Sequence, residues 1–203
     1  MIEALLAQLD RVTGYEPVGQ GFESLAAHQQ YPFLAIVRDG FLFLQGVNQM
    51  EREIRNSAKA LIIKDGKMAA IKISDGSEEW YIMPGGGQES DETLPEAVCR
   101  EVTEELGISV KCEELLFVIE GVHGEDFHRV DLIFACEYIG ELPNAELHSD
   151  TNQVGIEWLD ISVLNSLPLY PSKLRRQIMN YYEGKPYKCY LGNEEVGDPE
   201  CTD

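Results

Sequence analysis

Basic residues are scarce in this chain of 203 residues. It has 16 lysines and arginines against 36 aspartates and glutamates, which gives a formal net charge of -20. A surface of this sign repels a phosphate backbone, which disfavours nonspecific binding to nucleic acid. It also repels a free anionic ligand, so a bound phosphate ester would need a cation between itself and the protein.

Cysteine pairs, leader segments and long apolar runs are also missing. The five cysteines include no C-x-x-C pair, so we expect neither a disulfide framework nor a zinc site, and the reducing cytoplasm fits them best. The N-terminus has no basic segment followed by an apolar core, as a signal peptide would. No apolar run reaches the ~20 residues of a membrane-spanning helix, so we expect a cytoplasmic protein with no membrane partner.

The chain is long enough for one domain with an added segment. A polar stretch around Met50 separates residues 1–50, which we interpret as an N-terminal extension or small accessory lobe that covers a site or builds a homodimer. The alternative is that Met50 is the true start and the upstream part a gene-model extension. Residues 51–192 form the main domain. Residues 193–203 carry five acids and almost nothing apolar, which predicts a disordered tail.

Strand and helix patterns alternate irregularly along the main domain, which predicts an α/β fold with a mixed sheet between helices. Hairpins are expected at Asp39-Gly40 and Asp65-Gly66, because each pair is flanked by apolar strand patterns. The stretches ELLFVIEGV and HRVDLIFACEY follow a central helix and read as two further strands. A last helix, LYPSKLRRQIMNYYEG, has Ser172 as its candidate N-cap.

The central helix is acidic and follows a run of three glycines. Thr93 and Glu96 form a capping box that marks its start. At ~100° per residue, Glu101, Glu104 and Glu105 lie together beside the apolar stripe of the helix. Like charges at this spacing, near the C-terminal end of a helix, are unfavourable.

A divalent cation would reverse both effects. Mg²⁺ prefers oxygen ligands and shares its shell among carboxylates, waters and substrate phosphates. The glycines from Gly85 to Gly87 would let the backbone approach such an ion and offer it a carbonyl oxygen. The alternative is an ordinary solvated acidic face.

The spacing resembles the Nudix box, Gx5Ex7REUxEExGU, in which U is aliphatic. Every fixed position is present: Gly86, Glu92, Arg100-Glu101-Val102, Glu104-Glu105 and Gly107-Ile108. The resemblance extends roughly from Arg55 to Tyr190. It implies a Nudix-type (MutT-like) α/β/α sandwich with a mixed β-sheet. It also implies hydrolysis of the phosphoric anhydride bond in a nucleoside diphosphate linked to another moiety, with Mg²⁺ or Mn²⁺.

The resemblance also implies residue roles by matching position. The metal ligands would be Glu101, Glu104, Glu105 and the Gly85 carbonyl, and the catalytic residues Glu101, Glu104 and Arg100, which orients the glutamates. Glu92 would support the loop. The general base is Glu101 or a loop glutamate, Glu125 or Glu146. The candidate substrate contacts are Gly86, Gly87, Arg129 and Glu125.

Some neighbouring residues have a functional and an ordinary interpretation. Trp80 and Tyr81 stack on a base or pack within the sheet, and Arg129 meets a phosphate or faces solvent. The loop histidines His123, His128 and His148 are candidate substrate contacts or ordinary surface residues.

The box implies the class of reaction, but it does not identify the substrate. ADP-ribose pyrophosphatases of this family often carry a proline shortly after the box, and none lies between Gly107 and Leu142. Members that cleave dinucleoside polyphosphates often carry a tyrosine in the same segment, but the first tyrosine after Gly107 is Tyr138, too far along to match that pattern. The stretches RNSAKALIIKDGK and GIEW resemble bacterial ADP-ribose pyrophosphatase-like proteins, so ADP-ribose or another NDP-sugar is expected. The alternatives are an NTP pyrophosphatase that cleans the nucleotide pool and a sensing module that binds a nucleotide without cleaving it.

Overall fold

The computed structural model divides the chain into two units, Met1–Glu51 and Arg52–Asp203. It describes residues 33–38, 41–46, 53–123, 127–145, 147–148 and 152–194. In the first unit, β1 (Phe33–Arg38) and β2 (Phe41–Gly46) pair antiparallel, which confirms the strands expected on either side of Asp39-Gly40.

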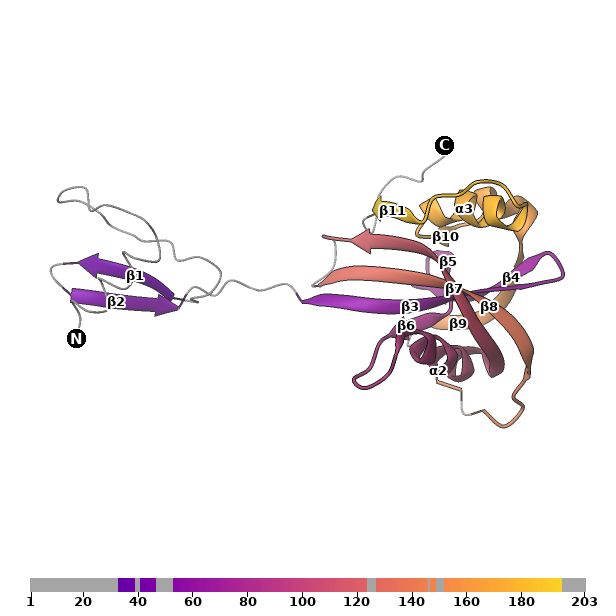
Figure 1. The fold of residues 1–203 in the computed structure, drawn as a ribbon, viewed down its shortest axis with the longest axis horizontal. Helices are drawn as coiled ribbons and strands as arrows, with labels where there is room; N and C mark the ends of the chain where they lie inside the picture. The colour runs from indigo at the N-terminus through magenta and orange to yellow at the C-terminus, as the bar shows by residue number, and fades with distance from the viewer. Residues whose placement is uncertain are drawn as a thin grey trace. The chain divides into compact units, whose positions relative to one another are not determined.

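The second unit holds the candidate site (Figure 1). Its strands are β3 (Ile54–Lys64), β4 (Lys67–Ser74), β5 (Glu79–Ile82), β6 (Gly85–Gly87), β7 (Ile108–Gly121), β8 (His128–Glu141), β9 (Gln153–Asp160), β10 (Leu169–Tyr170) and β11 (Tyr190–Asn193). Its helices are α2 (Leu94–Leu106), the 3₁₀ helix η1 (Ile161–Ser166) and α3 (Lys173–Tyr182). No helix in these described stretches is long and apolar enough to cross a lipid bilayer.

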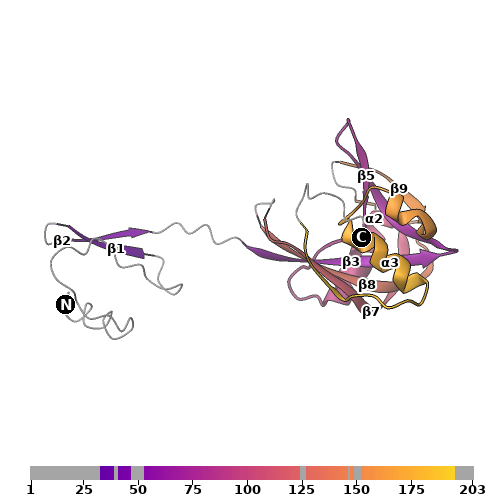
Figure 2. The ribbon, with the colours of Figure 1, turned by 90° about the horizontal axis from the view of Figure 1, so that it is seen from above.

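The strands form one mixed sheet, as the sequence predicts. Its order is β10-β5-β4-β3-β8-β7-β11, with β6 added to β3 and β9 added to β4. The central strands β3 and β8 run parallel, and β7 lies antiparallel to β8 (Figure 2). In this register Ser57 lies opposite Asp131, so residues far apart in the sequence share one face of the sheet.

Two hydrophobic cores lie on opposite faces of this sheet. Successive residues of a strand point to opposite sides, so β3 contributes to both cores. Ala58 and Ala60 are fully buried in the core that contains Val98 of α2, whereas Leu61 belongs to the core that contains Leu174 of α3. The two helices therefore cover opposite faces (Figure 1), and the unit is an α/β/α sandwich.

Local sequence signals explain the turns around the site. Asp65 and Gly66 have positive φ angles of 50° and 76°, as the tight β3–β4 hairpin requires. The capping box of Thr93 and Glu96 is present at the start of α2, and Gly107 ends the helix in the left-handed conformation at φ 65°. These features confirm the predicted hairpin and helix boundaries.

The C-terminal end of the unit differs from the expectation. Ser172 occupies the N-cap position of α3 but makes no side-chain capping hydrogen bond. The Glu194 carboxylate instead accepts hydrogen bonds from the backbone N–H groups of Ser172 and Lys173. Glu194 is only 4% exposed and follows β11 directly, so the ordered unit includes Asn193 and Glu194, beyond the predicted boundary at residue 192.

Candidate active site

The glycine strand β6 lies very close to β3. A Cβ atom added to Gly85, whose φ is +120°, would be 2.2 Å from the carbonyl oxygen of Ala58. No side chain can therefore replace the glycine without moving the backbone. This contact fixes the position of the Gly85 backbone beside α2.

Gly86 makes a second close contact, with Glu101 of α2. A Cβ atom at Gly86 would lie 2.5 Å from the carboxylate carbon of Glu101. The missing side chain thus leaves the space that the Glu101 carboxylate fills, and it brings backbone and carboxylate oxygens together.

Glu105 reaches the same strand one turn further along α2. Its Oε2 atom accepts a hydrogen bond from the Gly85 backbone N–H over 2.7 Å. Glu101 and Glu105 therefore both face the glycine strand, as their separation of four residues requires.

Arg100 links the box glutamates to one another. Its guanidinium donates to Glu92 over 2.8 and 3.1 Å, to Glu101 over 2.8 Å and, less closely, to Glu104 over 3.4 Å. It also donates to the carbonyl oxygen of Gly87 over 3.0 Å. Glu96, four residues before Arg100, belongs to the capping box, where its carboxylate accepts from the Thr93 backbone N–H over 2.7 Å. The planar guanidinium is suited to several carboxylates at once.

This network changes the acid–base behaviour of its members. The hydrogen bonds from Arg100, and then that from the Glu89 backbone N–H, lower the pKa of Glu92 below its ordinary value of 4.5. The pKa of Arg100 is raised, chiefly by its hydrogen bonds to Glu92. Both groups are therefore charged at neutral pH.

The predicted metal ligands suit a hard divalent cation by their chemistry. The predicted donors, on Glu101, Glu104, Glu105 and the Gly85 carbonyl, are all oxygen atoms, which are the ligands that Mg²⁺ prefers. An ammonium group, that of Lys59, donates to the same Gly85 carbonyl, so a cation already lies against this oxygen. Within the described residues, no three His, Cys, Asp or Glu side chains are grouped closely enough to hold an ion as they stand. The glutamates are instead occupied by Arg100 and the Gly85 amide.

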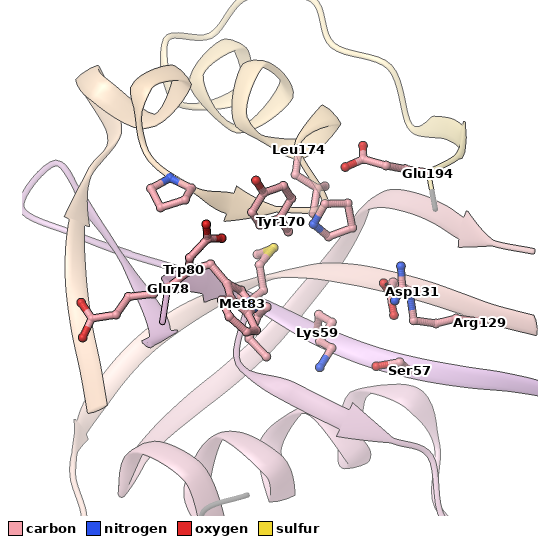
Figure 3. A pocket seen from close by; sticks show the side chains of 14 residues that line it. Ser57, Lys59, Glu78, Trp80, Met83, Arg129, Asp131, Tyr170, Leu174 and Glu194 are labelled. Atoms are coloured by element: carbon pink, nitrogen blue, oxygen red, sulfur yellow. Dashed lines mark ion pairs between the residues drawn. The ribbon is translucent and has the colours of Figure 1, made fainter. Parts of the chain in front are cut away.

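A pocket of about 520 Å³ adjoins this loop on the α3 side of the sheet. Figure 3 shows its floor, where Ser57 and Lys59 of β3 lie beside Arg129 and Asp131 of β8. The remaining labelled lining residues include Trp80, Met83, Tyr170, Leu174 and Glu194. The volume falls in the ~300–1,000 Å³ range of ligand pockets, and the lining combines aromatic faces with charged groups.

Lys59 connects the pocket with the glutamate loop, and the sequence interpretation missed it. It lines the pocket, and its ammonium group donates to the carbonyl oxygen of Gly85. A signal was present: in the strand SAKAL, polar Ser57 and Lys59 alternate with alanines, so they share one face. The sequence of β3 does not show that this face lines a pocket, because the pocket also needs α3, which is distant in sequence.

Of the other candidate site residues, some line the pocket and others do not. Arg129 lines the pocket and pairs with Asp131 over 2.9 Å, so it does not simply face solvent. Trp80 lines the pocket, whereas Tyr81 donates to Glu157 over 2.8 Å and packs against the core on the α3 side. Glu125 and Glu146 lie outside the described residues.

The three loop histidines do not converge on the glutamates. His123 is exposed, and Nε2 of His128 lies 3.1 Å from Glu120. His148 is exposed, and its backbone N–H donates to the carbonyl oxygen of Glu104 over 2.9 Å. That bond holds the loop against the C-terminal end of α2.

Known proteins resemble this chain over the same region. Residues 54–181 match the family model of the NUDIX domain. The chain is 29% identical over 126 residues to an ADP-ribose pyrophosphatase of Methanocaldococcus jannaschii, covering 61% of this chain and 72% of that protein. It is 32% identical over 102 residues to a MutT-like protein of Streptomyces ambofaciens, covering 50% and 60%. A NUDIX hydrolase structure from Nitrosomonas europaea superposes with a TM-score of 0.55 at 23% identity, over 68% of this chain and 93% of that one, and shows the same fold.

Proposed function

The chain belongs to the Nudix family of hydrolases, which act on phosphoric anhydride bonds, and we propose that it cleaves a nucleoside diphosphate linked to another moiety into a nucleoside monophosphate and a phosphorylated product. We propose ADP-ribose or another NDP-sugar as the substrate. The observation that carries the proposal is the meeting of Glu101 and Glu105 with the glycine strand, beside a pocket large enough for a nucleotide.

In this proposal Glu101, Glu104, Glu105 and the Gly85 carbonyl hold Mg²⁺ or Mn²⁺. When bound, the metal neutralises charge on the phosphates and makes a bound water a better nucleophile. Arg100 keeps Glu101 and Glu104 in place through its ion pairs. Without the Arg100 guanidinium, the carboxylates of Glu101 and Glu104 would repel each other and turn toward solvent.

The pocket would hold the substrate beside the loop. Trp80 and Tyr170 offer aromatic faces for a base, and Arg129 offers positive charge for a phosphate. Gly86 and Gly87 let a phosphate approach the backbone closely. A water molecule would add to one phosphorus as the bridging P–O bond breaks. A carboxylate, Glu101 or one of the loop residues Glu125 and Glu146, would accept the proton of that water.

Several features support the NDP-sugar assignment. The relative from Methanocaldococcus jannaschii is named an ADP-ribose pyrophosphatase, and it aligns with this chain over most of its own length. The pocket combines aromatic side chains with acceptors such as Glu78, Asp131 and Glu194, which suit a base and a hydroxyl-rich sugar.

A turnover screen tests the proposal. The full chain is incubated with Mg²⁺ and ADP-ribose, other NDP-sugars, dinucleoside polyphosphates or NTPs, and the products are identified by mass. AMP and ribose phosphate from ADP-ribose would support it. Pyrophosphate and a monophosphate from one NTP would instead indicate an enzyme of nucleotide-pool cleaning. Tight binding of one compound without turnover would indicate a sensing module.

We propose that residues 1–50, which include the β1–β2 hairpin, form an accessory lobe that supports a homodimer. Removal of residues 1–49 should then lower the molar mass measured by light scattering to that of a monomer. An intact mass of the native protein that begins at Met50 would contradict the lobe.

A further inference from the structure

Lys59 has an unusual position for a lysine. It lies in the middle of β3 between Ala58 and Ala60, which are both fully buried. Its side chain faces the pocket, and its ammonium group donates to the backbone carbonyl of Gly85. A cation is therefore held by the polypeptide at the edge of the glutamate loop.

The carbonyl that receives this cation has little freedom to turn away. Gly85 pairs with Lys59 in the β3–β6 ladder, and a Cβ atom added to it would lie 2.2 Å from the Ala58 carbonyl oxygen. Its N–H group is held by Glu105. A cation that approaches this carbonyl must therefore meet the lysine or displace it.

The same carbonyl is one of the ligands that the proposed function gives to the metal. Two cations on one carbonyl oxygen repel strongly, because they lie only a few ångströms apart in a partly buried site. The metal and the Lys59 ammonium group therefore exclude each other from Gly85.

We propose that Lys59 is a displaceable internal cation, which holds the Gly85 carbonyl when no metal is bound and turns into the pocket to bind a substrate phosphate when the metal enters. This inference rests on the proposed function, because it needs a metal at the glutamate loop. Lys59 is then a substrate-binding residue that also couples the binding of metal and of nucleotide.

The pocket gives the displaced ammonium group suitable partners. Asp131, on the same face of the neighbouring strand β8, offers a carboxylate. Among the described residues that line the pocket, the cationic side chains are Lys59 and Arg129, so these two can bind a substrate phosphate. A substrate brings at least two negative charges to a chain whose net charge is -20. The lysine that the metal releases supplies positive charge at the place where the phosphates need it.

The displacement of Lys59 would couple metal binding to nucleotide binding, so that each strengthens the other. Metal binding alone is weakened, because it must displace Lys59. Metal binding with a nucleotide present is tighter, because the phosphate accepts the released ammonium group. By linkage, the nucleotide likewise binds more tightly when the metal is present.

The first test measures Mn²⁺ affinity without nucleotide, from the electron paramagnetic resonance signal of free Mn²⁺. The acidic surface also binds Mn²⁺ weakly. The Mn²⁺ binding of each variant is therefore compared with that of the same variant carrying Glu105→Gln, and the difference between the two gives the binding at the glutamate loop. Lys59→Met should bind Mn²⁺ about tenfold more tightly than the natural chain. Lys59→Gln provides a second uncharged variant, and circular dichroism checks that both fold.

Two controls separate the charge of Lys59 from other effects. Lys64→Met removes a lysine from the end of the same strand, where it lies over the Tyr138 ring, and should leave the Mn²⁺ affinity of the loop unchanged. Lys59→Arg keeps the charge and should bind Mn²⁺ as weakly as the natural chain. A merely structural role for Lys59 predicts weaker Mn²⁺ binding in every Lys59 variant.

The second test adds the α,β-methylene analogue of ADP-ribose, which cannot be cleaved at the pyrophosphate. It should tighten Mn²⁺ binding clearly in the natural chain and much less in Lys59→Met. Suppose that Mn²⁺ binding by the natural chain depends on Glu105 but that Lys59→Met binds Mn²⁺ no more tightly. This result would overturn the role of Lys59 and leave the proposed metal site standing. If Glu105→Gln has no effect on Mn²⁺ binding by the natural chain, the metal site of the proposed function fails as well.

Discussion

The backbone N–H of Gly85 donates to Oε2 of Glu105 over 2.7 Å, which joins the glycine strand to the last turn of α2. The bond gives a buried amide an acceptor and gives a carboxylate near the unfavourable end of the helix a donor. The carbonyl of the same residue accepts from Lys59, which lines the pocket. Gly85 therefore connects the glutamates on one face of β3 with the pocket on the other.

Replacing Gly86 should damage activity more than stability. In Gly86→Ala the new methyl group would lie 2.5 Å from the Glu101 carboxylate, which is the mobile end of a side chain and can move aside. A displacement of this size at a reacting centre lowers turnover by about 100-fold. The measurement is kcat/KM together with thermal unfolding.

Gly140→Ala is the matched control for Gly86→Ala. Nothing lies within 4 Å of a Cβ atom at Gly140, and its backbone needs no positive φ. Turnover equal to that of the natural chain is expected. Equal losses in the two variants would contradict the role of the space at Gly86.

Arg100→Lys should lower both stability and turnover, although it keeps the charge. A single ammonium group cannot reproduce the contacts of the guanidinium with Glu92, Glu101 and Glu104. We expect a loss of about 1–3 kcal/mol in the free energy of unfolding, measured with urea. Arg176→Lys, on the exposed side of α3, should change neither property. An unfolding free energy that Arg100→Lys leaves intact would argue against this network.

Acid should weaken the same network through Glu92. Because its folded-state pKa lies below the ordinary value of 4.5, Glu92 contributes stability above that pH, and the contribution is lost as pH falls through the lower folded value. In Glu92→Gln the difference from the natural chain should be largest at neutral pH and should shrink below pH 4.5. Urea unfolding at several pH values measures this, and a difference that stays constant with pH would refute the assignment.

Glu194 should stabilise α3 although it lies outside the predicted domain. It is 4% exposed, and its carboxylate accepts from the backbone N–H groups of Ser172 and Lys173 at the helix N-terminus. Glu194→Gln should lower the unfolding free energy by about 1–2 kcal/mol. Glu183→Gln, at the exposed other end of α3, should have little effect. Equal small effects of the two would mean that Glu194 does not cap the helix.

The parts of the fold that the sequence predicts best are those set by neighbouring residues. Thr93 and Glu96 bond to each other across one helical turn, and Asp65-Gly66 adopts its turn without help from distant parts of the chain. The spacing of Glu101 and Glu105 places them on one side of α2 in any helix of that register. These features depend only on local geometry.

The features that the sequence did not predict depend on distant contacts. Lys59 meets the pocket because β3 pairs with β6 and β8 and because α3 covers its outer face. Glu194 replaces Ser172 as the cap only because β11 joins β7 and brings it to the start of α3. The sequence assigned Asn193 and Glu194 to a polar tail, because composition alone does not reveal that a carboxylate is buried as a helix cap.

Metal-dependent catalysis by the box glutamates can be tested by measuring the cleavage of ADP-ribose by the full chain and by Glu105→Gln, with products identified by mass. We expect AMP and ribose phosphate to form with Mg²⁺ and not with a chelator. We also expect Glu105→Gln to lower the rate by about a thousandfold while the fold is retained. Cleavage that needs no metal, or that proceeds unchanged in Glu105→Gln, would contradict the assignment of these glutamates to a metal-dependent active site.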